Sequence, residues 1–180
     1  MGVTPVRIDE LSASAIDARM AELVALVEDA VCGNASVGFV LPLAQGELEA
    51  FWRDMALDVE DGVRTVLAAW QDERLVGSAQ LAPSLKANQR HRADVQKLLV
   101  LRSARRQGIA TALMRALEAR AVQGGRTLLT LDTREDSEAD RLYRGMGWVA
   151  VGRIPDYAAD PDLRMGGCVF FYKQLAAAAT

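Results

Sequence analysis

The segment of residues 94–122 constrains the fold more than any other part of the chain. Apolar and polar residues alternate over residues 94–101, which predicts a strand, and the apolar spacing of residues 109–122 is typical of a helix. Between them lies the basic turn Arg105-Arg106-Gln107-Gly108-Ile109-Ala110. Glycine lets the main chain approach a ligand closely, and a helix N-terminus presents free N–H groups at the positive end of its dipole. This strand–turn–helix unit therefore predicts a site for a phosphate or pyrophosphate.

Strand-like and helix-like segments follow one another along the rest of the chain. Short apolar runs predict strands over residues 3–8, 65–70, 75–81, 127–133, 148–154 and 167–174. Apolar residues at helical spacing predict further helices over residues 16–31, 48–59 and 137–146. Polar loops are expected at residues 83–92 and 155–165, and residues 176–180 are expected to fray. This order predicts a single α/β domain over residues 1–175, with helices on both faces of a mixed sheet.

Composition excludes several classes of function. The chain has 180 residues and a net charge of −3, which gives no basis for binding nucleic acid. No apolar stretch approaches the roughly 20 residues that span a bilayer, and residues 1–10 lack the apolar centre of a signal peptide. Cys32 and Cys168 have no metal-ligand spacing, so we expect reduced thiols in a cytoplasmic protein. Because His91 is the only histidine, a histidine-based triad or a metal centre is not expected.

The basic turn and its neighbours resemble the acetyl-CoA signature of the GNAT N-acetyltransferase superfamily. The matching features are Arg-x-x-Gly-x-Ala after a strand, and, at residues 142–148, a Leu-Tyr pair before a glycine and an aromatic residue. The resemblance implies an enzyme that moves an acetyl group from acetyl-CoA to a primary amine by direct attack through a tetrahedral intermediate. It also implies the GNAT fold, a mixed central sheet with a splay between two parallel strands, here residues 94–101 and 127–133.

The resemblance further implies how acetyl-CoA is held. The pantetheine arm would pair with the backbone of Leu99, Val100 and Leu101. The pyrophosphate would bind the N–H groups of the turn, at Arg105, Arg106, Gln107, Gly108, Ile109 and Ala110. Two adjacent arginines at the positive end of a helix are unfavourable without an anion, although a solvated arginine-rich helix start is the alternative. Asp136 stands where family members often have an asparagine that touches the coenzyme, so that contact is not expected here.

Three side chains are candidates for catalysis. In the superfamily, a tyrosine at the position of Tyr143 protonates the leaving thiolate, and a phenol with a pKa near 10 is matched to that task. Asp94 and Asp132 are candidates for the base that takes the proton of the acceptor ammonium, and a backbone N–H near Leu99 or Val100 would hold the oxyanion. The alternatives are a core tyrosine for Tyr143, a solvent-facing strand residue for Asp94 and a helix or turn cap for Asp132.

Similarity to one subgroup of the superfamily covers nearly the whole chain, from about residue 21 to 175. Residues 34–39, 93–98, 131–133 and 155–157 resemble the tabtoxin resistance acetyltransferases, which modify an amino-acid toxin. Their two acidic residues match Asp94 and Asp132, although the first is a glutamate there. Ser36, Phe39 and Tyr157 would then line the acceptor site. Asp156, Asp160 and Asp162 would favour a cationic acceptor, although an ordinary solvated loop is the preferred interpretation of these three aspartates.

Two alternatives remain for the function. The first is an acetyltransferase that acts on a protein N-terminus or a lysine, which would need a flat, open groove. The second is a sensor that binds acyl-CoA without transfer, in which the tyrosine and the carboxylates are dispensable. The acceptor and the length of the acyl group are left open. Many members of the superfamily form homodimers, but nothing in the sequence requires one.

Overall fold

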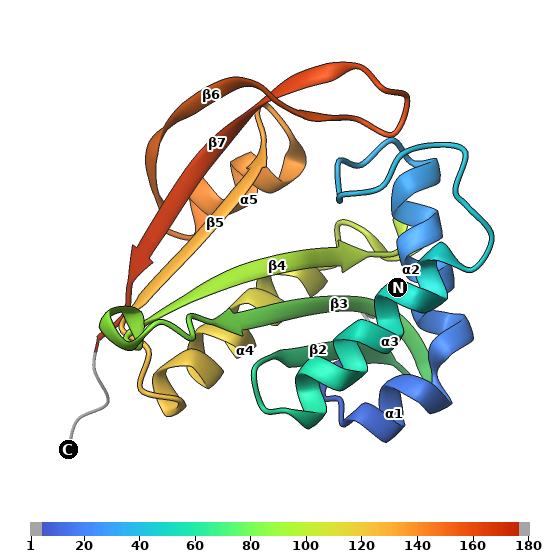
Figure 1. The fold of residues 1–180 in the computed structure, drawn as a ribbon, viewed down its shortest axis with the longest axis horizontal. Coiled ribbons are helices and arrows are strands. Elements are labelled where there is room, and N and C mark those ends of the chain that lie inside the picture. The colour runs from blue at the N-terminus through green and yellow to red at the C-terminus, as the bar shows by residue number, and fades with distance from the viewer. Residues whose placement is uncertain (1–4, 177–180) are drawn as a thin grey trace.

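The computed structural model describes residues 5–176, which form a mixed sheet flanked by helices (Figure 1). The seven strands are β1 (Val6–Glu10), β2 (Thr65–Gln71), β3 (Arg74–Pro83), β4 (Arg92–Val100), β5 (Leu128–Arg134), β6 (Val149–Ala159) and β7 (Met165–Gln174). The helices are α1 (Ala13–Ala18), α2 (Met20–Cys32), α3 (Glu47–Glu60), α4 (Ile109–Gln123) and α5 (Glu138–Gly145), with single 3-10 turns at Ala87–Gln89 and Arg102–Ala104. No helix in residues 5–176 is long and apolar enough to cross a membrane.

The strands run in the order β1-β2-β3-β4-β5-β7-β6, and all neighbours are antiparallel except β4 and β5. This parallel pair is short, because only Arg92, Ala93 and Asp94 pair with residues 128–130. Beyond Asp94 the two strands diverge, so their carboxyl ends lie far apart (Figure 1). The predicted splay between the two central parallel strands is therefore present.

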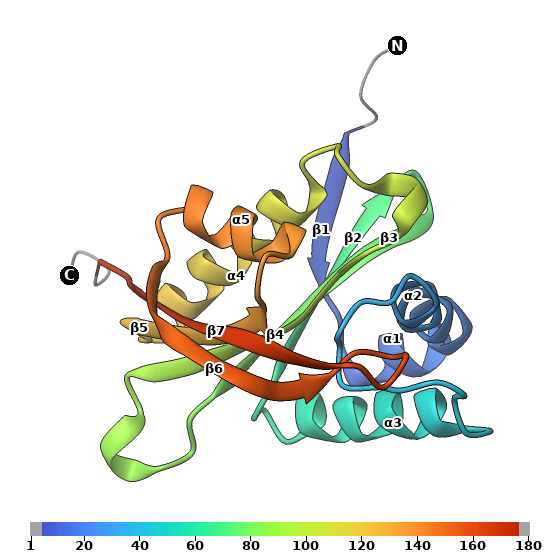
Figure 2. The same ribbon diagram turned by 90° about the horizontal axis from the view of Figure 1, so that it is seen from above.

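The helices cover both faces of the sheet, with α4 and α5 on one face and α1, α2 and α3 on the other (Figure 2). Each face has its own apolar core, since strand residues alternate between faces. Leu113, Met114 and Leu117 of α4 are fully buried in one core, and Leu23 and Trp52 are fully buried in the other. The predicted mixed α/β class is confirmed.

The helix predicted over residues 16–31 is two helices. Arg19 leaves helical geometry at φ −111° and ψ 17°, so the chain changes direction between α1 and α2. This break lets Ile16 and Leu23, which lie on separate helices, both reach zero exposure in the same core. Ser12 caps α1 by accepting a hydrogen bond from the N–H of Ala15 at 3.1 Å. Periodicity missed the break because the apolar spacing continues through it.

The strand predicted to end at residue 154 continues to Ala159. Pro155 has no N–H to donate, but β6 is an edge strand with an irregularity between Ile154 and Ala158, and proline is tolerated there. The predicted loop over residues 155–165 is therefore reduced to residues 160–164. Two further predictions fall partly outside the described residues: the start of the first strand, at residues 3–4, and most of the frayed tail.

Candidate active site

The splay leaves one edge of β4 without a partner strand. Leu101 donates its N–H to the carbonyl of Val76 on β3 at 2.9 Å, and Leu99 pairs with Ser78. Backbone groups point to alternate edges along an antiparallel strand, so the N–H and C=O of Val100 face the splay. An extended ligand inserted between β4 and β5, such as the pantetheine arm, would form hydrogen bonds with these two groups. Of the three residues predicted to bind pantetheine, only Val100 therefore directs its backbone N–H and C=O into the space between β4 and β5. The backbone groups of Leu99 and Leu101 face β3.

The predicted phosphate turn has the backbone geometry of an anion site. Arg106 at φ 64° and Gly108 at φ 81° are left-handed, and Gly108 is the N-cap of α4. Within the described chain, no acceptor pairs with the amides of residues 106–111, and the first intrahelical bond runs from Ala112 to Gly108 at 3.0 Å. A Cβ at Gly108 would meet no atom within 4 Å. The turn thus presents a row of free donors to open space, which is what a pyrophosphate requires.

The side chains of the turn differ from one another in their surroundings. Arg105 and Arg106 lie 3.7 and 4.0 Å from the carboxylate of Glu138, at the start of α5. Exposed pairs at such distances contribute little, so both guanidinium groups stay available to a stronger anion. Gln107 instead accepts a hydrogen bond from Gln71 at 2.8 Å, which ties the turn to the end of β2. Ile109 is buried in the core beneath the turn.

A bulge in β4 brings Lys97, which was not singled out from the sequence, toward Asp132 across the splay between β4 and β5, which is called the cleft from here on. The register shifts by one residue between Ser78 and Gln80, and Lys97 on the bulged strand adopts φ 50°. Its ammonium lies 5.9 Å from the ring centre of Phe39 and 5.7 Å from that of Phe51 on α3. Partial burial lowers the pKa of Lys97, Arg64 lowers it further, and the charge of Asp132 opposes both. The only sequence signal is a lysine within a strand that is otherwise partly buried.

Asp132 lies on β5, on the cleft face of the diverging strands. Its strand neighbour Leu131 is buried in the α4 core, so Asp132 points to the opposite face. Although its surface is accessible, surrounding protein displaces enough water to raise the pKa of Asp132. Lys97 partly offsets that rise, and Asp94 adds to it. Asp132 does not cap α5, because Ser137 is the N-cap and accepts from the N–H of Asp140 at 3.0 Å.

Asp94 lies at the last parallel pair, where the splay begins. Its carboxylate accepts a hydrogen bond from the hydroxyl of Thr130 and lies 3.7 Å from the guanidinium of Arg92. Asp94 therefore joins β4 to β5 at the closed end of the cleft. Its half-exposed carboxylate already has two partners, whereas no other side chain within residues 5–176 pairs with the carboxylate of Asp132.

Tyr143 on α5 is packed between aromatic neighbours. Its ring centre lies 5.8 Å from Trp148 and 5.9 Å from Phe171, and only 5% of the residue is exposed. Burial, together with the negative charge of Asp132, raises the pKa of the Tyr143 phenol well above its ordinary value. No acceptor for its hydroxyl is found in the described part of the chain. Tyr143 is therefore a core residue, and it also lies close enough to Asp132 for that charge to act on its phenol. The two interpretations of Tyr143, as a core tyrosine and as a residue of the cleft, are compatible.

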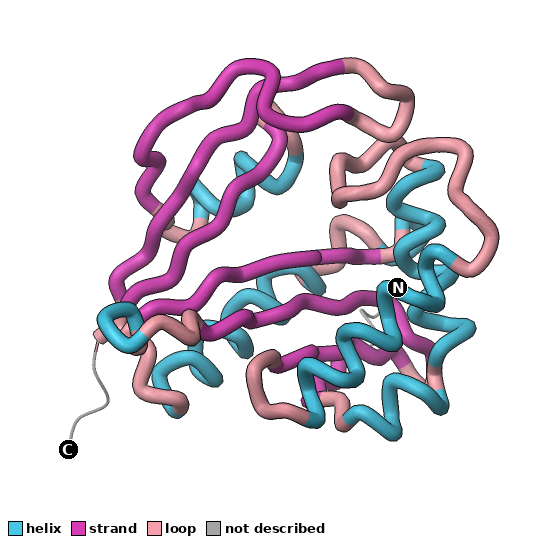
Figure 3. Tube along the Cα trace, viewed as in Figure 1, coloured by secondary structure: helices cyan, strands magenta, loops and turns pink. Residues whose placement is uncertain are grey.

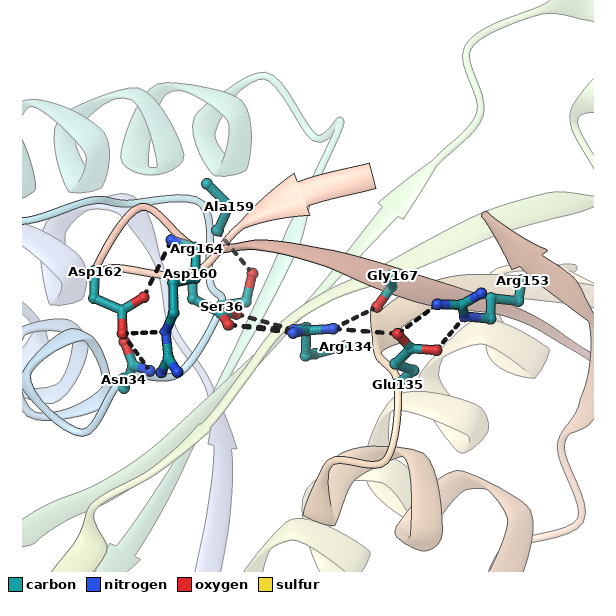
Figure 4. Close-up of polar contacts among 10 residues, drawn as sticks. All are labelled: Asn34, Ser36, Arg134, Glu135, Arg153, Ala159, Asp160, Asp162, Arg164 and Gly167. Carbon is teal, nitrogen blue, oxygen red and sulfur yellow. Dashed lines mark hydrogen bonds and ion pairs between the residues drawn. The ribbon is translucent and has the colours of Figure 1, made fainter. Parts of the chain in front are cut away.

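The loop between α2 and α3 and the loop between β6 and β7, far apart in the sequence, contact each other (Figures 3 and 4). Ser36 donates its hydroxyl to the carbonyl of Ala159 at 3.3 Å, and Leu41 donates its N–H to the carbonyl of Pro161 at 2.8 Å. Tyr157, predicted in a loop, lies on β6 and packs edge-on against Phe170 with ring centres 5.0 Å apart. Phe170 pairs with Asp132 across β5 and β7. The predicted acceptor residues thus come from two segments that contact each other: Ser36 and Phe39 lie in the loop before α3, and Tyr157 lies on β6.

Arg134, at the end of β5, contacts residues at both ends of the loop between β6 and β7 (Figure 4). Its Nε lies 3.1 Å from Asp160, and it donates to the carbonyl of Gly167 at 3.1 Å. Asp162 instead pairs with Arg164 at 2.8 Å. These contacts agree with reading Asp160 and Asp162 as loop residues that hold the loop rather than a substrate.

Replacing Gly166 by alanine is expected to free the loop of residues 160–164. The new Cβ would lie 1.9 Å from the guanidinium carbon of Arg134, so Arg134 must move away from Asp160. Hydrogen exchange should become faster at the amides of Asp160 and Leu163, which pair within the loop at 2.8 Å. Gly152→Ala is the matched control, because its Cβ would meet no atom within 4 Å. Unchanged exchange in Gly166→Ala would contradict a supporting role for Arg134.

The fold and the cleft together define an acetyltransferase. The chain belongs to the acetyltransferase (GNAT) family, whose model matches residues 22–148. It is a GNAT-type N-acetyltransferase that depends on acetyl-CoA, and the residues of the turn and of the β4 edge fit that donor.

Known relatives agree with this assignment. The chain is 32% identical over 157 residues to an N-acetyltransferase from the hisH–hisA intergenic region of Azospirillum brasilense, covering 85% of this chain and 89% of the relative. A ribosomal-protein-alanine N-acetyltransferase of Brucella melitensis has a TM-score of 0.77 at 23% identity, over 94% of this chain and 99% of that one. A Salmonella typhimurium acetyltransferase solved with acetyl-CoA has a TM-score of 0.77 at 15% identity, over 97% and 96% of the two chains. These two structures share the fold.

Proposed function

We propose that the protein acetylates a primary amine of a small molecule, and that Asp132 is the base. The observation that carries this proposal is the position of Asp132, a carboxylate of raised pKa on the cleft side of β5 under two loops that bridge the opening. A raised pKa brings a carboxylate closer to the range in which it accepts a proton efficiently near neutral pH. Asp132 also attracts the ammonium form of the acceptor.

The side chains and backbone groups of this cleft account for each proton transfer in the reaction. Asp132 takes one proton from the acceptor ammonium, directly or through water, and the free amine attacks the thioester carbonyl carbon. The N–C bond forms, the oxyanion is held by the N–H of Val100, and the C–S bond then breaks. The thiolate receives a proton from the hydroxyl of Tyr143, which is restored by a second proton from the amine nitrogen through water. The products are the acetamide, coenzyme A and one proton released from Asp132.

Asp94 has a supporting role in this proposal. Its carboxylate is engaged by Thr130 and Arg92, and its charge contributes to the raised pKa of Asp132. An aspartate in place of a longer glutamate keeps its carboxylate near the strand, which agrees with this arrangement. We therefore assign proton removal to Asp132 and electrostatic tuning of that group to Asp94.

Replacing Tyr143 by phenylalanine is expected to lower kcat by about tenfold and to leave KM for acetyl-CoA unchanged. The loss stays below the usual 10²- to 10⁴-fold contribution of a general acid because a phenol of raised pKa is a weaker acid. Phenylalanine keeps the contacts with Trp148 and Phe171, so the melting temperature should be unaffected. Tyr172→Phe on β7 is the control. Steady-state kinetics with full activity in Tyr143→Phe would remove Tyr143 from the reaction.

A small acceptor suits the cleft better than a peptide. A peptide acceptor would need an open, flat groove, whereas the contacts of Ser36 with Ala159 and of Leu41 with Pro161 join the two loops on this side of the sheet. The resemblance to the tabtoxin resistance acetyltransferases supports an amino-acid-like toxin or antibiotic as the acceptor. Ser36, Phe39 and Tyr157 would contact it.

Thiol release from acetyl-CoA, measured against a panel of amines, tests the proposal. The panel contains amino acids, tabtoxinine-β-lactam, aminoglycosides, polyamines and a lysine peptide, with mass detection of the product. We expect one class of small amine to be acetylated well above the rest. Preference for the lysine peptide would support the peptide alternative. Tight binding of acetyl-CoA without any transfer would instead support a sensor.

We further propose that two copies of the chain associate through β6. This strand lies at the sheet edge, where backbone groups lack a neighbouring strand, and Val151 on it is 70% exposed. Light scattering should give twice the mass of one chain, and a monomer mass would refute the dimer. The cytoplasmic location expected from the sequence stays a prediction.

A further inference from the structure

Lys97 is a half-buried cation that lacks a partner in the described chain. Its ammonium has three N–H donors, but no hydrogen bond or ion pair links it to any of residues 5–176. The aromatic rings of Phe39 and Phe51 cover one side of it within 6 Å. Taking an ammonium partly out of water is costly unless a hydrogen-bond acceptor compensates. The missing acceptor points to a ligand.

The surrounding charges indicate what this ligand carries. Arg64, the cation whose charge acts on Lys97, is already engaged by Asp58 at 2.8 Å and by the side-chain oxygens of Gln80 and Gln96 at 3.1 and 2.9 Å. Asp132 faces Lys97 from β5 and lowers the cost of its charge, but the two side chains form no ion pair. The cleft therefore contains one available cation and one available carboxylate close enough to influence each other.

The bulge is the reason that Lys97 reaches this cleft. Gln96 pairs with Gln80, and Leu99 pairs with Ser78, so two residues of β4, Lys97 and Leu98, lie opposite one residue of β3. The extra residue allows Lys97 to face Phe51 on α3, while Leu98 packs on the α4 core. Regular alternation would have placed Lys97 on the opposite face from Gln96. The ammonium thus lies on the same side as the acceptor loops and Asp132.

We propose that Lys97 binds a carboxylate of the acceptor, so that the acceptor is an amino acid or a close analogue. The inference rests on the proposed acetyl transfer, and it adds the group that selects the acceptor. A molecule with an ammonium and a carboxylate on the same carbon matches this pair of charges, because its ammonium can face Asp132 while its carboxylate accepts N–H donors from Lys97. Charge-assisted hydrogen bonds of this kind are the stronger ones in proteins.

Matched acceptor pairs test the proposal. L-alanine, L-methionine and L-phenylalanine are each compared with their primary amides, which keep the amine and lose the negative charge. Binding is measured by calorimetry with coenzyme A present, and acetylation is measured as kcat/KM. The variants are Lys97→Met, Lys97→Arg, and Lys86→Met as the control at an exposed lysine.

The wild-type protein should prefer at least one acid over its amide. Lys97→Met should reduce that preference by about ten- to a hundredfold, the range of a hydrogen bond to a charged group. Lys97→Arg should keep part of the preference, and Lys86→Met should keep all of it. Binding of the acid should show the same loss, so that the effect is visible without transfer.

Three results would overturn the inference. If Lys97→Met lowers kcat/KM equally for the acid and the amide, and the acid limb of the pH profile moves to higher pH, then Lys97 acts only on Asp132. Acetylation of other amines without binding of any amino acid would leave the proposed function intact and assign the acceptor to another class. Absence of transfer to every amine would instead refute the proposed function, on which the inference rests.

Discussion

Replacement of Asp132 by asparagine is expected to lower kcat by about 10²- to 10⁴-fold, the usual contribution of a general base. The amide is nearly isosteric with the carboxylate but does not accept the proton of the ammonium. KM for acetyl-CoA should change little, because the donor-binding turn lies in another part of the cleft. Steady-state kinetics at saturating acetyl-CoA measure both quantities. Asp156→Asn on exposed β6 is the control, and equal activity of both variants would remove Asp132 from the reaction.

The pH dependence of the wild-type enzyme should report the same group. Asp132 acts as a base only when it is ionised, so activity rises with pH through its pKa in the folded protein. Burial and Asp94 raise that pKa, and therefore the acid limb of kcat should lie above the range of an ordinary carboxyl group. Asp132→Asn should lose this limb. A limb at the position of an unperturbed aspartate would contradict the assignment.

Asp132→Asn should also be at least as thermally stable as the wild-type protein at neutral pH. A carboxyl group whose pKa is raised on folding stabilises the fold below its unfolded pKa, and this contribution disappears as the pH rises through the folded pKa. Ionised Asp132 is therefore unfavourable in the folded state near neutrality, and asparagine removes that charge. A clear fall in melting temperature would show that the loss of activity comes from unfolding.

Replacement of Gly108 by alanine is expected to raise KM for acetyl-CoA by about ten- to a hundredfold. Gly108 has φ 81°, and an L-residue in that conformation costs roughly 1–2 kcal/mol. If the turn relaxes, the amides of residues 106–111 lose their common direction, and if it does not, the Cβ occupies the space in front of them. Either result weakens pyrophosphate binding more than it affects kcat. Titration of acetyl-CoA in steady-state assays measures the change.

Gly125→Ala separates coenzyme binding from backbone strain. Gly125 follows the other end of α4, has φ 74°, and likewise has no atom within 4 Å of an added Cβ. Both variants should therefore lose similar stability, and only Gly108→Ala should lose affinity for acetyl-CoA. A similar rise in KM for both variants would mean that the effect comes from α4 as a whole.

Local features of the sequence predicted the fold class and the elements on either side of the basic turn. The positions of β4, α4 and the intervening turn follow from residues close together in the chain, since alternation, helical spacing and one glycine are local signals. The helix break at Arg19 and the extension of β6 past Pro155 were missed. Both depend on neighbours from other elements, because Arg19 lies over the ring of Trp70 at 5.1 Å and β6 is completed by its pairing with β7.

The sequence by itself determined which residues were available for chemistry, including Asp94, Asp132, Tyr143 and the glycine turn. Only the tertiary structure decided that the carboxylate of Asp94 has side-chain partners and that of Asp132 does not. Thr130 on β5 and Arg92 at the start of β4 both contact Asp94. The tertiary structure also brought Lys97 beside Asp132 through a bulge set by the pairing of β3 with β4. Charge and hydrogen bonding act across short distances in space, and a linear sequence does not specify those distances between separate strands.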